Sequence, residues 1–137
     1  MNETRRSFLK KTATASSATL VAPTILSSKV FGSNDRINAA VLGVNGRGKN
    51  HISSFMNQKN VQVTTLCDPD MKVLDKRQKE FYKKYNEKVS LEQDLRKVMD
   101  NKDIDVISIA SPNHWHSLSV IWACQAGKDV YLSLIHI

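Results

Sequence analysis

Short apolar runs alternate with stretches of helical periodicity over residues 34–132. The apolar runs predict five strands: at 36–42, at 61–67, one ending near Val89, at 105–110 and at 130–132. Between them, apolar residues recur every three or four positions, as on one face of a helix. Buried strands that alternate with helices are typical of a parallel sheet with helices on both faces. We therefore predict an α/β fold with a doubly wound parallel sheet.

Local side-chain chemistry predicts where two of the helices begin. Asp68 is expected to cap the helix that follows it, with Pro69 in the first helical position. Ser90 and Gln93 have the spacing of a capping box, which predicts that Ser90 caps the next helix.

Two cysteines lie in apolar patterns, Cys67 in a predicted strand and Cys124 in a helix predicted over 116–126. That helix is apolar nearly all round, and Gly127 is expected to end it. The two cysteines have no metal-ligand spacing. We expect both to be buried as small hydrophobic side chains. Their oxidation is the alternative if the protein is exported.

Basic residues are concentrated near the start of the chain. The 137 residues carry a net charge of +7, and residues 1–33, with five basic side chains against Glu3, contribute four of these charges. Residues 4–10 read TRRSFLK, which resembles the twin-arginine export signal, and a weakly apolar stretch follows at 12–26. We interpret residues 1–33 as a twin-arginine signal peptide; a basic amphipathic helix is the alternative. This predicts a periplasmic or otherwise exported protein, the twin-arginine translocase as a partner, and no nucleic-acid partner.

A glycine-rich turn between the first strand and the first helix carries the first chemical signal. It consists of Gly43, Val44, Asn45, Gly46, Arg47 and Gly48. Gly43 allows a tight turn, Gly48 allows the helix to pack closely, and backbone N–H groups at the helix start can hold a pyrophosphate. Asn45 stands where the usual G-x-G-x-x-G pattern has glycine. Asparagine tolerates left-handed backbone, but its side chain has the bulk to crowd the phosphates. An ordinary glycine-rich turn is the alternative.

Asp68 strengthens this interpretation. It ends the second strand, 25 positions after Gly43. A carboxylate there can accept hydrogen bonds from the ribose hydroxyls of a dinucleotide, and it would repel a 2′-phosphate. The pattern therefore favours NAD over NADP, and this role is compatible with helix capping by Asp68.

A third group of polar residues follows the fourth predicted strand. It consists of Ser111, Pro112, Asn113, His114, Trp115 and His116. Ligands of open α/β sheets bind outside the carboxyl ends of the strands. We expect no metal there, because the two histidines are only two positions apart and no third ligand is near. The alternative is structural: a turn at Pro112 and Asn113, with His116 capping the next helix.

Three segments together resemble the N-terminal domain of the Gfo/Idh/MocA oxidoreductases, of the exported twin-arginine type. They read AVLGVNGRGKNHI, LCDPD and DVISIASPNHWHSLSVIWACQAGKDVYL and span 36–132 in order. The resemblance implies a Rossmann fold over 34–132, NAD as cofactor and hydride transfer on a sugar-like hydroxyl. It also implies that Trp115 shapes the sugar entrance and that four residues lie near the nicotinamide ribose: Ser111, Pro112, Asn113 and His116.

The family pattern ends after Leu132. Where the family has Glu-Lys-Pro, this chain reads SLIHI at 133–137, so the expected catalytic lysine is absent and no catalytic residue is assigned. We expect a truncated protein without the C-terminal substrate domain, inactive by itself, whose tail derives from sequencing-adaptor read-through. Resequencing the locus would test this. For the intact protein the resemblance implies a sugar substrate and a homo-oligomer. An NAD-dependent glycosidase and a catalytically dead nucleotide-binding fragment are the alternative functions.

Overall fold

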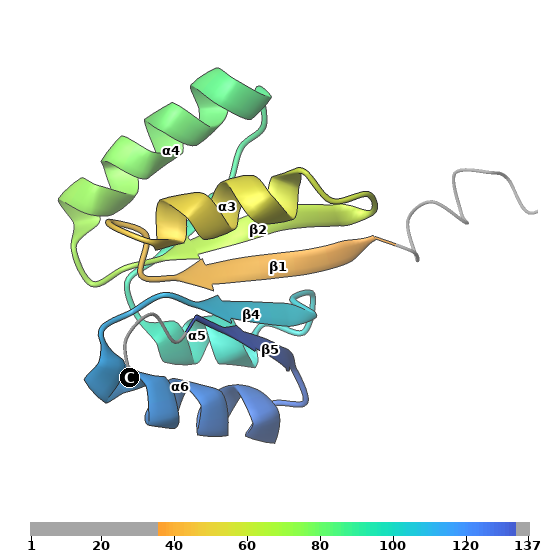
Figure 1. Ribbon diagram of the computed structural model, residues 1–137, viewed down its shortest axis with the longest axis vertical. Helices are drawn as coiled ribbons and strands as arrows, with labels where there is room; N and C mark the ends of the chain where they lie inside the picture. Colours follow the sequence, from red (N-terminus) through yellow and green to blue (C-terminus); the bar gives the residue numbers. More distant parts are fainter. Residues whose placement is uncertain (1–35, 134–137) are drawn as a thin grey trace, which may run out of the picture. The chain divides into compact units, whose positions relative to one another are not determined.

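Strands and helices alternate throughout residues 36–133, the part of the chain that the computed structural model describes (Figure 1). The predicted signal peptide and residues 134–137 lie outside this part. The elements, in chain order, are β1 Ile37–Leu42, α3 Gly48–Met56, β2 Val61–Cys67, α4 Met71–Tyr85, β3 Ser90–Glu92, α5 Leu95–Asp100, β4 Val106–Ile109, α6 Asn113–Gln125 and β5 Asp129–Leu132.

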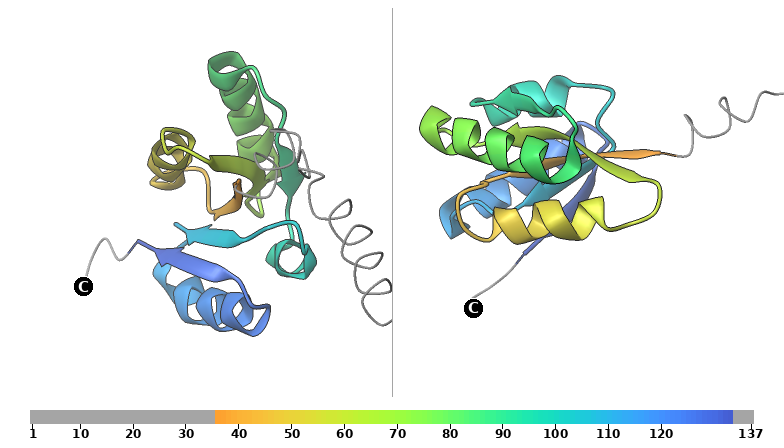
Figure 2. Two further views of the ribbon diagram at one scale, coloured as in Figure 1. Left: turned by 90° about the vertical axis from the view of Figure 1, so that its right-hand side faces the viewer. Right: turned by 90° about the horizontal axis from the view of Figure 1, so that it is seen from above.

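The strands form one parallel sheet in the order β3-β2-β1-β4-β5, which confirms the doubly wound α/β prediction. The order reverses at β1, which has β2 on one side and β4 on the other. Leu42 at the end of β1 is in register with Cys67 of β2 and Ile109 of β4. The carboxyl ends of the three central strands therefore lie at the same edge of the sheet (Figure 2).

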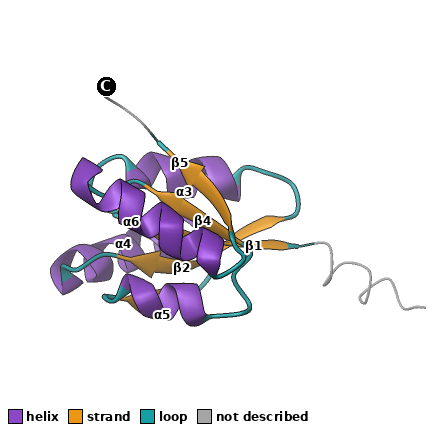
Figure 3. Cartoon of the chain, turned by 90° about the horizontal axis from the view of Figure 1, so that it is seen from below, coloured by secondary structure: helices purple, strands orange, loops and turns teal. Residues whose placement is uncertain are grey.

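Helices cover both faces of the sheet, with α3 and α4 on one face and α5 and α6 on the other (Figures 1 and 3). Neighbouring residues of a strand point to opposite faces. Accordingly, Val41 belongs to the cluster under α3 and α4, whereas Leu42 belongs to the cluster under α5 and α6. Both are almost completely buried, which explains why β1 has no polar residue after Asn38. None of the described helices is long and apolar enough to cross a membrane.

The start of α4 differs from the prediction, because Asp70 and not Asp68 is its N-cap. The Asp70 carboxylate accepts a hydrogen bond from the N–H of Lys72 at 2.9 Å, and the helix begins at Met71. Asp68 has other partners: its carboxylate accepts from the N–H groups of Val44 and Asp70. Asp68 and Asp70 both have capping chemistry. Because the Asp68 carboxylate is bound to the Val44 N–H, Asp70 caps the helix.

The predicted capping box at Ser90 is also wrong. Ser90 begins β3, one residue after the strand end expected at Val89, and it pairs with Thr65 of β2. Because β2 pairs with β3 along this edge, Ser90 has extended backbone in the sheet and does not cap a helix. Asp94 caps α5 instead, with its carboxylate accepting from the N–H of Arg96 at 3.0 Å.

Helix α6 begins at Asn113, three residues before the predicted start, so His116 lies within the first turn and is not a cap. The helix ends as predicted. Gly127 has a φ of +71° and donates its N–H to Cys124, while the N–H of Lys128 donates to Ala123, which is a Schellman motif.

Cys67 is buried as predicted, but Cys124 is exposed. The buried side of α6 consists of His116, Ser119 and Ala123, at the spacing of one helix face. Cys124 lies one residue further round the helix and therefore faces outward. A helix that looks apolar all round in the sequence is thus only partly buried.

Candidate functional site

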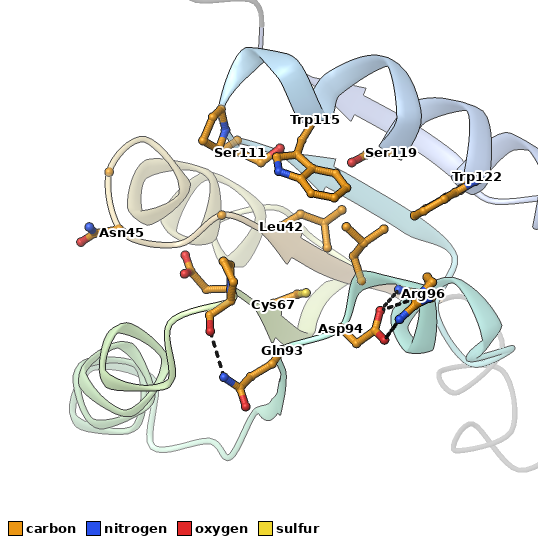
Figure 4. Close-up of a pocket in the computed structure, with 17 residues that line it drawn as sticks. Leu42, Asn45, Cys67, Gln93, Asp94, Arg96, Ser111, Trp115, Ser119 and Trp122 are labelled. Atoms are coloured by element: carbon orange, nitrogen blue, oxygen red, sulfur yellow. Dashed lines mark hydrogen bonds and ion pairs between the residues drawn. The ribbon is translucent and has the colours of Figure 1, made fainter.

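A pocket of about 1060 Å³ opens at the carboxyl edge of the sheet, where the strand order reverses at β1 (Figure 4). Open α/β sheets bind their ligands at such a switch point. The pocket is lined by Leu42, Gly43, Asn45, Gly46, Cys67, Asp68, Pro69, Gln93, Asp94, Leu95, Arg96, Ala110, Ser111, Pro112, Trp115, Ser119 and Trp122.

The glycine loop between β1 and α3 forms one wall, and two of its glycines are required by packing. Gly43 has a φ of +79°, and a Cβ there would lie 2.7 Å from the backbone nitrogen of Ser111. A Cβ on Gly48 would collide with the carbonyl oxygen of Gly43. These contacts confirm the tight turn at Gly43 and the close helix packing at Gly48.

Gly46 differs from the other two glycines, because a Cβ there would meet no protein atom within 4 Å. It lines the pocket together with Asn45. Asn45 is exposed and is not among the described residues with left-handed backbone, so the tolerance expected of asparagine is not used. Its side chain points away from the other lining residues in Figure 4. The space beside Gly46 is therefore free of protein atoms.

Asp68 holds the start of this loop. Its Oδ2 accepts from the N–H of Val44 at 3.0 Å and its Oδ1 from the N–H of Asp70 at 3.1 Å. The residue is only 8% exposed, yet it lines the pocket. Each carboxylate oxygen can accept more than one hydrogen bond, so Asp68 retains acceptor capacity toward a ligand.

Arg77 of α4 holds the same loop from behind, and sequence reasoning missed it. Its Nε donates to the carbonyl of Val44 at 2.7 Å and its Nη2 to the carbonyl of Asn45 at 2.5 Å. The available signal was spacing, because Arg77 follows Leu74 by three residues and precedes Phe81 by four, on the buried face.

The segment after β4 forms the opposite wall. Ser111 and Pro112 line the pocket, and Trp115 projects from α6 toward Leu42 (Figure 4). His116 Nε2 lies 2.7 Å from the carbonyl oxygen of Ser111. A carbonyl only accepts, so Nε2 carries the proton in this contact and His116 anchors the Ser111 backbone.

Two hydroxyl groups in this wall have no hydrogen-bond partner among the described residues. They are the Oγ atoms of Ser111 and Ser119, both buried. Buried hydroxyls are normally paired, so both have capacity for a ligand or water. Five predicted site residues do not line the pocket: Val44, Arg47, Gly48, Asn113 and His116.

Charges around the pocket are largely compensated. Arg96 is the one basic residue among the lining residues, and its Nη2 lies 2.7 Å from Asp94 Oδ2. Hydrogen bonds from Arg96 lower the pKa of Asp94 to about 2. Burial, together with nearby carboxylates, raises the pKa of Cys67 to about 12, so this pocket residue is a neutral thiol at neutral pH.

The chemistry of the pocket is compatible with a dinucleotide. It combines a loop with open space at Gly46, a buried carboxylate at Asp68 and apolar walls with two available hydroxyls. Small-molecule sites are typically apolar with a few placed polar groups, as here. The structure thus brings six of the predicted site residues into one pocket: Gly43, Asn45, Gly46, Asp68, Ser111 and Pro112.

Comparison with known proteins agrees with this geometry. Residues 37–133 match the Gfo/Idh/MocA family model, described as an oxidoreductase family with an NAD-binding Rossmann fold. A glycosyl hydrolase family 109 protein of Shewanella pealeana is 26% identical over 104 residues, which cover 73% of this chain and 23% of that protein.

Solved structures share the fold. An NAD-binding protein from Listeria innocua has a TM-score of 0.63 at 21% identity, covering 71% of this chain and 27% of that one. Scyllo-inositol dehydrogenase from Lactobacillus casei, solved with NAD(H) and scyllo-inositol, has a TM-score of 0.60 at 22% identity with the same coverage. The chain spans about a quarter of the length of these relatives. Because the family model covers most of its length, the chain belongs to the Gfo/Idh/MocA oxidoreductase family and carries that family's NAD-binding Rossmann fold.

Proposed function

We propose that the pocket at the carboxyl edge of the sheet binds NAD(H), with the pyrophosphate against the glycine loop. One observation carries this proposal: Gly46 lines the pocket and leaves space that no protein atom fills. The pyrophosphate contacts would come from the backbone N–H groups of Asn45 and Gly46 and from the start of α3. Arg47 is exposed beside this helix start and adds positive charge.

Asp68 would accept hydrogen bonds from the adenosine ribose, and the segment after β4 would hold the nicotinamide half. Ser111 and Pro112 line the pocket there, with Trp115 toward the substrate, whereas His116 would act through the Ser111 carbonyl and Asn113 stands outside the pocket wall. Bound NAD supplies a hydride acceptor, and the protein orients it.

We propose a preference for NAD over NADP. Asp68 is a carboxylate in the wall of the pocket, and a 2′-phosphate beside it would be repelled. Arg96, the one basic residue of the described wall, is paired with Asp94, so its charge is partly compensated before a ligand binds.

Titration of the chain with NAD+ and NADP+ tests both proposals. NAD+ is expected to bind more tightly than NADP+. Asp68→Asn keeps an oxygen for the Val44 N–H but removes the charge, so NAD+ affinity is expected to fall by about tenfold and the preference to shrink. NADP+ binding as tight as NAD+ binding in the unmodified chain would overturn the preference. Absence of any dinucleotide binding would overturn the cofactor site itself.

We propose further that the whole protein transfers hydride between NAD and a sugar or sugar-like hydroxyl. Membership of an oxidoreductase family with an NAD-binding Rossmann fold supports this proposal. So does the shared fold with scyllo-inositol dehydrogenase, which was solved with NAD(H) and a sugar-like polyol. A second candidate, an NAD-dependent glycosidase, is favoured by the relatives named glycosyl hydrolase family 109. Product analysis separates the two: sugar release without net NADH supports the glycosidase, and NADH accumulation with an oxidised sugar supports the dehydrogenase.

Export through the twin-arginine translocase to the periplasm is a separate proposal. It rests on the TRRSFLK sequence at 4–10, outside the described residues. Assembly of the whole protein as a homo-oligomer is likewise proposed from the family resemblance.

A further inference from the structure

Arg77 lies behind the glycine loop, outside the pocket wall. It is only 8% exposed, although arginine is seldom buried unless paired. Its partners are two successive carbonyl oxygens of the loop, those of Val44 and Asn45, at 2.7 and 2.5 Å. The third contact, from Nη1, goes to Glu80 Oε2 at 2.5 Å on the same helix.

These two contacts fix the orientation of two peptide groups. The described residues contain no cis peptide bond, so the C=O and the following N–H point in opposite directions. The carbonyls of Val44 and Asn45 point to Arg77. The N–H groups of Asn45 and Gly46 therefore point away from Arg77, on the side of the loop opposite to α4.

Both of those N–H groups are available. Neither has an acceptor among the described residues, and both Asn45 and Gly46 line the pocket. The preceding N–H, that of Val44, is instead bound to Asp68 at 3.0 Å. Asp68 and Arg77 thus hold the Val44 residue by its N–H and its C=O, and the next two N–H groups remain for a ligand.

We propose that Arg77 is a positioning residue for the dinucleotide pyrophosphate, acting through the loop carbonyls to aim the Asn45 and Gly46 N–H groups at it. This inference rests on the proposed NAD(H) site. Arg77 is not among the residues that line the pocket and reaches it only through the loop carbonyls, and Glu80 compensates its charge. Hydrogen bonding to Arg77 is the largest influence that lowers the pKa of Glu80, so this carboxyl is ionised at neutral pH. Arg77 therefore acts mainly by orientation and not by attracting phosphate from a distance.

The test compares two ligands that differ in the pyrophosphate. Adenosine has no phosphate, whereas ADP-ribose carries the pyrophosphate of NAD. In the full chain, Arg77→Met is expected to weaken ADP-ribose binding by about tenfold and to leave adenosine binding within about twofold, measured by titration with NMR detection. A merely structural role would weaken both ligands equally.

Lys128 provides a matched control, because it is also 8% exposed and also holds two backbone carbonyls. Its Nζ donates to Asn101 at 2.6 Å and to Ile104 at 2.8 Å, before the start of β4 and away from the pocket wall. Lys128→Met is expected to lower stability without changing the affinity ratio of ADP-ribose to adenosine.

Arg77→Lys is the second variant, used if Arg77→Met does not fold. The lysine ammonium keeps the buried charge but lacks the forked guanidinium that reaches both carbonyls. This variant is expected to lower the ADP-ribose to adenosine affinity ratio. An unchanged ratio in the folded Arg77 variants would overturn the inference. Failure of the unmodified chain to bind ADP-ribose would overturn the proposed NAD(H) site and this inference with it.

Discussion

Gly46 and Gly48 lie two residues apart but meet different constraints. Gly48 has no room for a side chain because a Cβ would collide with the Gly43 carbonyl, whereas Gly46 faces space free of protein atoms. The position of Gly48 in the glycine pattern predicted its close packing, whereas the pattern assigned no separate role to Gly46. The tertiary structure adds that Gly46 lines the pocket and that a Cβ there would meet no protein atom within 4 Å.

Alanine at these two positions is therefore expected to give opposite results. Gly48→Ala should lower the free energy of unfolding by about 1–3 kcal/mol, because the surrounding backbone has to shift. Gly46→Ala should change it by less than about 1 kcal/mol, yet weaken NAD+ binding by about tenfold, because the methyl group occupies space proposed for phosphate. Urea denaturation and calorimetric titration measure the two quantities. A stable Gly46→Ala chain with unchanged NAD+ affinity would contradict the proposed phosphate position.

At the scale of elements, a buried polar contact joins α3 to the sheet. His51 Nδ1 lies 2.8 Å from Ser108 Oγ of β4, and the His51 ring meets that of Tyr131 edge to face at a centroid distance of 5.4 Å. His51 is 4% exposed and Ser108 is completely buried. This contact joins the helix that follows the glycine loop to the strand that precedes Ser111.

The His51 contact predicts a pH-dependent stability. Burial, and secondarily Arg47, lowers the pKa of His51 below its ordinary value of 6.5, so the fold favours the neutral ring. Just below pH 6.5, His51 is protonated in the unfolded chain but remains neutral in the folded chain. This contribution to stability is therefore complete above pH 6.5 and is lost as the pH falls from there to the folded pKa.

Urea denaturation between pH 5 and 7.5 measures this effect. His51→Gln, which keeps hydrogen-bonding atoms for Ser108 but does not titrate, is expected to flatten the dependence of unfolding free energy on pH in this range. His114→Gln is the control, because His114 is exposed on α6. Equal slopes in the His51→Gln and unmodified chains would show that His51 is not the titrating group.

The sequence predicted the existence and type of these elements better than their ends. The strand 61–67 is found as expected, whereas α4, α5 and α6 all begin at other residues than predicted. Several residues near each start have capping chemistry, and the choice among them depends on distant partners. The carboxylate of Asp68 accepts a hydrogen bond from the Val44 N–H, and Ser90 pairs with Thr65 in the sheet.

At the scale of the whole molecule, the proposed export signal would account for the uneven distribution of charge along the chain. The proposed signal holds four of the seven net charges, and the pocket in the described domain has one basic residue in its wall. Replacing both Arg5 and Arg6 by lysine preserves this charge but alters the twin-arginine pair, for which lysine is not equivalent.

This double variant is expected to be retained in the cytoplasm, with the periplasmic fraction falling to background in cell fractionation. Lys29→Arg, a change in the same segment but outside the motif, is expected to leave export unchanged. Periplasmic recovery of the double-lysine variant at the level of the unmodified chain would overturn the export proposal.

The sequence by itself determined the α/β class, the two glycines required by packing, and the placement of Asp68 and Ser111 at strand ends. These features depend on local conformation and on strand periodicity, which neighbouring residues carry. Only the tertiary structure decided which aspartate caps α4, which side of α6 is buried and that Arg77 holds the glycine loop. Each of these depends on a partner far away in the chain, as Arg77 lies 33 positions from Val44. Sequence spacing cannot show such contacts until the sheet has brought the elements together.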